Sequence, residues 1–153
     1  MKKLFAIVLT FALLMSLSVT AFAVNTAGGT ADITTSIDPT YTVTIPADVN
    51  VTFNATETAF GAIEVTASQI HPDKCIKVAL TTDGELNNSI NATKVIPYAI
   101  KDSEGTEFTS ATYLTEGDKT ELSIHITADD WNAAYAGAYS DTVTFTVSYE
   151  DKA

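Results

Sequence analysis

From about residue 40 onward, apolar and polar side chains alternate in short runs, and this alternation limits most strongly how the chain can fold. The clearest run spans residues 142–149, where Val143, Phe145, Val147 and Tyr149 are interleaved with threonine and serine. A period of two residues places every second side chain on the same face of an extended strand. Threonine is β-branched and suits the solvated face of such a strand. The pattern therefore predicts β-strands that are buried on one face only.

Turn-forming residues separate the alternating runs. Pro46-Ala47-Asp48, Thr82-Asp83-Gly84 and Asp102-Ser103-Glu104-Gly105 each interrupt the pattern, and Gly61 marks a bulge or turn. The apolar positions predict strands within the ranges 41–45, 49–53, 63–67, 76–80, 96–100, 106–109, 122–126 and 143–149. Only residues 128–136 favour a helical turn, with Asp129 or Asp130 as its cap.

About eight or nine half-apolar strands need a second layer to cover their buried faces. Two antiparallel sheets packed face to face provide that layer, and a closed barrel is the alternative. We find no internal repeat and no linker between Thr40 and Glu150, so the fold we expect is all-β: a two-layer antiparallel β-sandwich that forms one domain.

The first 23 residues have a different character. Lys2 and Lys3 precede a run without charge from Leu4 to Phe22, and the run closes on Ala21-Phe22-Ala23. This order is typical of a secretory signal peptide with a cleavage site after Ala23, whereas a retained membrane anchor is the alternative. We therefore expect a signal peptide (1–23), a flexible N-terminal segment (24–30) and a β-sandwich domain (31–153). The expected location is secreted, extracellular or on the cell surface, with no membrane association after cleavage.

The charge of the processed chain excludes some partners. Without Lys2 and Lys3, six lysines and no arginine stand against 19 acidic residues, a formal charge of −13. Such a chain is repelled by phosphate backbones, so we expect no nucleic-acid partner. Cys75 is the single cysteine of the sequence and can form no internal disulfide.

Two segments resemble a known group of proteins. The stretch from Ala136 to Val147 (AGAYSDTVTFTV) is similar to the ending of secreted bacterial immunoglobulin-like domains, including spore coat protein U-like and pilin-like surface proteins. Tyr41-Thr42-Val43-Thr44-Ile45-Pro46 resembles the first strand of small exported proteins from Gram-positive bacteria. The resemblance implies an immunoglobulin-like fold with a structural role at the cell surface, in some cases in filaments or adhesion. The chain departs from the disulfide-bonded members of this group, because Cys75 has no partner.

Aromatic residues near the C-terminal end are the candidate ligand-facing residues: Trp131, Tyr135 and Tyr139. They could form a platform for a sugar, whereas the structural alternative is that Trp131 closes one end of the sandwich. We expect the Tyr139 hydroxyl to bond to nearby backbone, as in a tyrosine corner.

Catalytic and metal-binding patterns are weak. His71-Pro72-Asp73-Lys74-Cys75 brings an imidazole, a carboxylate and a thiol into one short loop, but zinc sites use three or four such ligands at recurring spacings. His125 lies between two isoleucines and is expected to point outward from a strand. The acidic segments 102–107 and 129–130 could offer oxygens to calcium but do not fit an EF-hand loop. We therefore expect no cofactor, no metal site and no enzymatic activity.

These observations favour a non-enzymatic secreted or cell-surface module of a bacterial envelope, with a structural or adhesive role. The expected partners are other cell-surface proteins or glycans. One alternative is a carbohydrate-binding module. Another is a pilin-like subunit that assembles by strand donation, in which residues 30–37 pair with the sheet edge of a neighbour and Ile33 and Ile37 act as anchors.

Overall fold

The computed structural model describes residues 30–152. The chain divides into two units, one that ends at Thr35 and one that begins at Ser36. Every strand belongs to the second unit. The predicted signal peptide and most of the segment 24–30 lie outside the described residues.

The larger sheet has four antiparallel strands in the order β1-β2-β8-β6. Its members are β1 (Thr40–Thr44), β2 (Glu57–Gln69), β6 (Ala99–Asp102) and β8 (Lys119–His125). The alternation of the sequence sets its inner face, because Ile63 and Val65 of β2 are fully buried and Leu122 and Ile124 of β8 nearly so.

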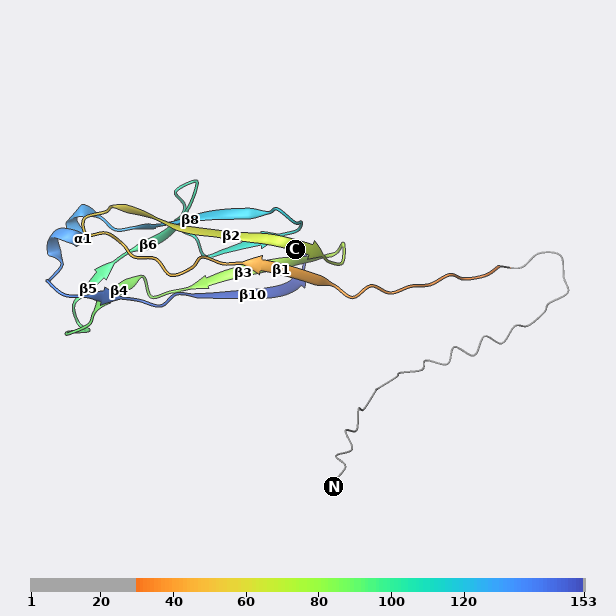
Figure 1. Cartoon of the computed structure of the whole chain (residues 1–153), viewed down its shortest axis with the longest axis horizontal. Helices are drawn as coiled ribbons and strands as arrows, with labels where there is room; N and C mark the ends of the chain where they lie inside the picture. The colour runs from red at the N-terminus through yellow and green to blue at the C-terminus, as the bar shows by residue number, and fades with distance from the viewer. Residues whose placement is uncertain (1–29, 153) are drawn as a thin grey trace, which may run out of the picture. The chain divides into compact units, whose positions relative to one another are not determined.

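A second sheet packs against the first and completes the core. It has the order β10-β3-β7 and comprises β3 (Lys74–Thr81), β7 (Ser110–Tyr113) and β10 (Thr144–Asp151). Ile76, Val78 and Tyr113 point from it into the same hydrophobic cluster as the buried residues of β2 and β8. The two layers are visible in Figure 1, with β2 and β8 in one and β3 and β10 in the other. The predicted all-β sandwich is confirmed.

A third, small sheet extends one end of the sandwich. It has the order β5-β4-β9 and consists of β4 (Glu85–Asn88), β5 (Val95–Pro97) and β9 (Tyr139–Ser140). The run 96–100, predicted as one strand, is divided between this sheet and the four-stranded one. Ile96 and Ile100 are both buried, so the alternation of buried side chains continues across the division. The backbone, however, pairs with β4 at Ile96 and with β8 at Ile100.

The described residues contain ten strands rather than eight or nine, and residues 49–53 are not one of them. Val49 and Val51 pack against the core, as their parity predicts, but no neighbouring strand is hydrogen-bonded to them. The alternation records which face of a segment is buried, and a strand also needs a partner for its backbone. The expected strand at 106–109 is reduced to one bridge between Lys101 and Glu107.

Gly61 and the one helix among residues 30–152 lie where the sequence predicts them. The pairing of β2 with β8 shifts register between Ala59 and Gly61, where Gly61 has a φ of +120°, so the predicted bulge is confirmed. The helix α1 (Ala128–Ala133) forms in the expected place, but its cap is Thr127, whose hydroxyl accepts from the Asp130 N–H at 3.1 Å. The prediction of an aspartate cap was wrong because threonine also caps well and stands one turn earlier.

Candidate functional site

The three predicted aromatic residues gather at the end of the sandwich that carries α1. Trp131 is half-buried, its indole N–H donates to the Ala55 carbonyl at 2.8 Å, and its ring meets Phe53 edge-on at 5.6 Å. A buried indole requires such an acceptor, and the bond ties α1 to the chain that precedes β2. Trp131 therefore closes this end of the sandwich.

Tyr139 holds the backbone of Tyr135. Its hydroxyl donates to the Tyr135 carbonyl at 3.0 Å and accepts from the Tyr135 N–H at 3.1 Å, while its ring packs against the core. This is the predicted tyrosine-corner arrangement, and it is confirmed. Tyr135 itself is 61% exposed, and the Lys94 ammonium lies 4.6 Å from the centre of its ring. Of the three rings, that of Tyr135 is the most open to solvent, and a cation already lies over one face.

Beside these aromatics runs a groove with a volume of about 1200 Å³. One wall is the chain after β1, residues 45–53, and the other is formed by residues 141–143 and the start of β10. Phe60 and Phe145 form part of the floor, with ring centres 6.0 Å apart. A groove of this size exceeds the roughly 300–1000 Å³ of a typical small-molecule pocket.

The groove exists because two sheet edges face each other without pairing. β1 is the edge strand of the four-stranded sheet, and β10 is the edge strand of the opposite sheet. They meet at the end near His71, where the rings of Tyr41 and Tyr149 stack with centres 5.8 Å apart. Toward α1 the chain leaves β1 at Ile45 and joins no strand again before Glu57. The gap between the edges is thus left open over the length of the groove.

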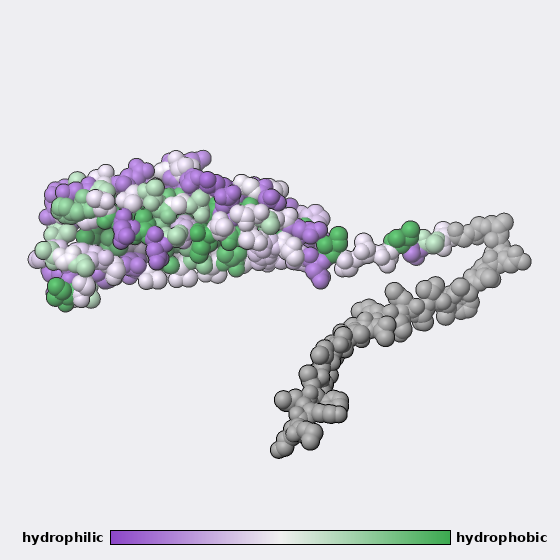
Figure 2. Space-filling model, in the orientation of Figure 1, coloured by the Kyte–Doolittle hydropathy of each residue, from purple (hydrophilic) through white to green (hydrophobic). Residues whose placement is uncertain are grey.

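Apolar side chains are exposed along this side of the molecule. Ile45 exposes 48% and Phe53 70% of their surface, and Val147 of β10 is also exposed. Figure 2 shows apolar residues on the face that carries β1 and β10. Exposed apolar groups beside unpaired strand edges are typical of a surface that binds another polypeptide.

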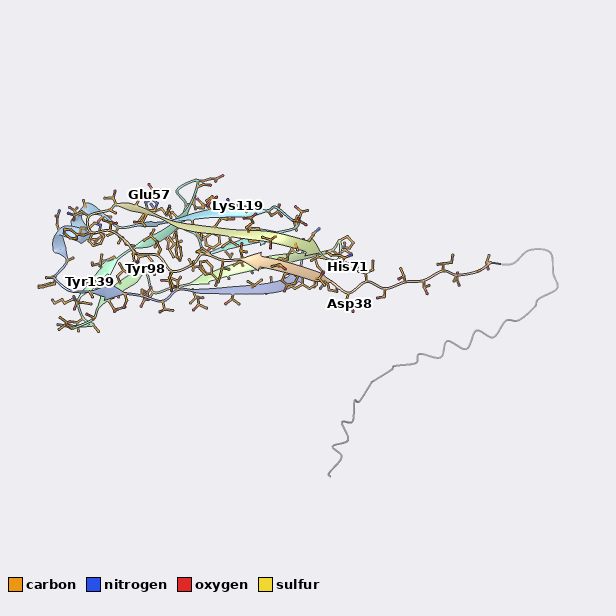
Figure 3. All side chains as sticks on the ribbon, viewed as in Figure 1. Asp38, Glu57, His71, Tyr98, Lys119 and Tyr139 are labelled. Atoms are coloured by element: carbon orange, nitrogen blue, oxygen red, sulfur yellow. The ribbon has the colours of Figure 1, made fainter. Side chains whose placement is uncertain are left out.

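A cluster of hydrogen-bonded polar side chains borders the groove. Tyr98 donates a short hydrogen bond to the Asp141 carboxylate, and the Thr82 hydroxyl lies 2.7 Å from the Tyr98 oxygen and 3.2 Å from the carboxylate. Burial raises the pKa of Tyr98, and the hydrogen bond to Asp141 raises it further. The phenol therefore stays protonated at neutral pH and holds Asp141 in place. Tyr98 and Tyr139 lie toward the same end of the sandwich, whereas His71 and Asp38 lie at the other (Figure 3).

The other ligand-type residues are engaged in local structure. The Asp73 N–H donates to Nδ1 of His71 at 3.3 Å, and Cys75 is buried in β3. The Asp102 carboxylate accepts from the N–H groups of Glu104 and Thr106, each at 2.9 Å, and so shapes its own turn. Within residues 30–152 no three His, Cys, Asp or Glu side chains are grouped closely enough to hold a metal ion.

His125 lies on the partly exposed face of β8, where its Nε2 is 2.9 Å from the Ser123 hydroxyl. The predicted outward orientation agrees with this position. No sequence signal indicated the groove, because residues 49–53 have the alternation of an ordinary strand.

The fold and the groove define a class of protein: an antiparallel β-sandwich with an open groove that is lined by both apolar and polar side chains. No family model matches the chain, and no curated protein matches it. Among the described residues, no helix has the length and apolar character needed to cross a bilayer.

Proposed function

We propose that this chain is a non-enzymatic secreted or cell-surface module, structural or adhesive in role, that binds another polypeptide through the groove. The open groove between residues 45–53 and the chain that leads into β10 is the observation that carries the proposal. An edge strand presents unpaired N–H and C=O groups, and an extended segment that pairs with them gains main-chain hydrogen bonds. Phe60 and Phe145 on the floor offer apolar surface to the side chains of that segment. The signal-peptide pattern of residues 1–23 supports export of the chain to the outside of the cell, where it can meet such a partner.

The location can be tested in the native host. Antibodies raised against the sandwich should label intact cells or detect the protein in the medium, and sequencing of that protein should begin at Val24. Recovery of the chain from the cytoplasm with residues 1–23 still attached would contradict the proposal.

Binding through the groove can be tested with nine-residue peptides displayed on phage. Peptides that alternate apolar and polar residues should be enriched, because they fit the floor with one face. Ile45→Asp should abolish this enrichment, whereas Ile90→Asp serves as the matched control: Ile90 is 86% exposed and does not line the groove. Equal loss in both variants, or no enrichment at all, would reject peptide binding.

The carbohydrate-binding alternative rests on Tyr135, whose exposed ring lies at the end of the groove. It is the weaker candidate because Trp131 and Tyr139 both use their polar groups to hold backbone. A glycan array probed with the wild type and with Tyr135→Ala separates the two functions. Glycan binding that is lost in Tyr135→Ala and kept in Ile45→Asp would favour the sugar-binding module.

A further inference from the structure

We propose that residues 30–38 of a second copy of this chain occupy the groove as an added β-strand beside residues 139–145, where β9 and the start of β10 line it. This inference rests on the proposed function of the groove and names its occupant. Four properties of the described chain support it. The groove borders a strand edge without a hydrogen-bonded neighbour, and residues 30–38 have the length and the alternation of a strand that could pair there. Pro39 opposes pairing of this segment with its own β1, and the aromatic floor of the groove can contact its isoleucines.

The edge strand β10 is hydrogen-bonded to a neighbouring strand on one side only. β10 pairs with β3 through all eight of its residues, from Thr144 with Thr81 to Asp151 with Lys74. No strand within residues 30–152 pairs with its other side. In an antiparallel pair alternate residues bond to the neighbour, so the remaining N–H and C=O groups of β10 lie on its other side, which borders the groove at Phe145. An incoming strand can bond to these groups.

The segment 30–38 has the pattern of a strand buried on one face. Ile33, Thr35 and Ile37 fall on one side of an extended chain, and Asp32, Thr34, Ser36 and Asp38 on the other. The segment contains neither glycine nor proline, and its isoleucines and threonines favour extended structure. Ile37 exposes 68% of its surface, so its apolar side chain is available to a partner.

The lengths of segment and groove agree. Residues 30–38 are nine in number, as are the residues 45–53 that form one wall of the groove. Nine extended residues span about 30 Å. The spacing of two isoleucines with one threonine between them places two large side chains on the floor, where the rings of Phe60 and Phe145 lie.

A proline opposes insertion of the segment into the groove of its own molecule. β1 starts at Thr40, so residues 30–37 could pair with the outer edge of β1 only through a tight hairpin with Asp38 and Pro39 as its two central residues. Two-residue hairpins require a positive φ at the first central residue. A residue before proline is confined to extended conformations, and proline is disfavoured at the second central position. The donor is therefore another copy of the chain.

Charge sets the expected response to salt. Each processed copy carries a formal charge of −13, and the segment and groove contribute aspartates but no lysine. Two copies repel each other, and salt screens this repulsion beyond about 8 Å at physiological ionic strength. Association by strand addition should thus strengthen as salt rises, whereas association through ion pairs would weaken.

Sedimentation velocity of the processed protein, purified from a secreting host, tests the proposal. The wild type should form dimers or larger species as its concentration rises from about 10 µM to 1 mM, and more so at higher salt. Ile33→Asp/Ile37→Asp should weaken the association at least about 100-fold, because two apolar side chains lose their burial. The matched control is Thr34→Asp/Ser36→Asp, which adds the same charge to the opposite face and should associate much more tightly than the isoleucine variant. Circular dichroism of each variant checks that the sandwich is folded.

Three results would overturn the inference: a wild type that stays monomeric at 1 mM, equal association of both double variants, or association that weakens with salt. A protein that stays monomeric but still enriches alternating peptides on phage would refute self-association and leave the proposed function standing. Loss of both readouts would reject the proposed function as well.

Discussion

Gly137 and Asn88 make the contact whose disruption can be calculated most directly. Gly137 has a φ of +148°, and a β-carbon placed on it would lie 2.5 Å from the Nδ2 atom of Asn88. Asn88 is 5% exposed, and its side-chain oxygen accepts from the N–H groups of Ile90 and Asn91 at 2.9 and 3.1 Å. The turn after β4 therefore depends on a glycine that lies in the other half of the chain.

Gly137→Ala should lower the free energy of unfolding by about 3 kcal/mol. Backbone strain at this φ costs roughly 1–3 kcal/mol for a residue with a β-carbon. The Asn88 amide must also move, which weakens two hydrogen bonds worth about 0.5–1.5 kcal/mol each. For a domain of this size, a change of about 3 kcal/mol corresponds to a fall in Tm of roughly 10 °C.

The matched control is Gly105→Ala. Gly105 also has a positive φ, +79°, but a β-carbon there meets no atom within 4 Å. This variant should lose only the strain, about 1–2 kcal/mol. Urea denaturation followed by circular dichroism gives both values. In an Asn88→Ala background, Gly137→Ala should cost less than it does in the wild type and lose only the backbone strain of about 1–3 kcal/mol, because the clash is gone. Equal losses for the two glycine variants in the wild-type background would refute the reasoning.

Three further predictions concern stability. Tyr139→Phe removes the hydroxyl that bonds twice to the Tyr135 backbone and should cost about 1–3 kcal/mol in urea denaturation, so an unchanged midpoint would contradict the tyrosine corner. Hydrogen bonds from the N–H groups of Leu114 and Thr115 hold the pKa of Asp118 below its ordinary value. The ionised carboxylate therefore stabilises the fold above the unfolded pKa of about 3.9, and this stabilisation is lost as pH falls through the folded pKa. Asp118→Ala should therefore be less stable than the wild type at neutral pH, and the difference should shrink as pH falls through the folded pKa, whereas a difference that stays constant into acid would reject this cause. Phe145→Asp, on the half-buried floor of the groove, should cost about 2–4 kcal/mol in thermal denaturation, and a wild-type Tm would show that the ring is not part of the core.

Much of the fold could be predicted because alternation reports burial directly. The runs at 76–80 and 122–126 became β3 and β8, and Gly61 became the expected bulge, since each depends on local sequence. The Tyr139 hydroxyl bonds were also predictable, because acceptor and donor lie four residues upstream.

The groove could not be predicted, because it depends on two segments far apart in the sequence that are not hydrogen-bonded to each other. Residues 49–53 have the alternation of a strand but no partner, and residues 141–143 face them across the gap. A sequence pattern records which side chains are buried and not whether a neighbouring backbone is within hydrogen-bonding distance. The change of sheet at Tyr98 was hidden for the same reason, since Ile96 and Ile100 keep their parity across it.

Contacts between two copies can be measured most directly by isotope-filtered NMR. A mixture of ¹³C-labelled and unlabelled processed protein reports only those nuclear Overhauser effects that connect different molecules. The added strand predicts such effects between the methyl groups of Ile33 and Ile37 in one copy and the rings of Phe60 and Phe145 in another. Their absence at a concentration where the copies associate, or contacts that map to another face, would contradict the assignment of the groove.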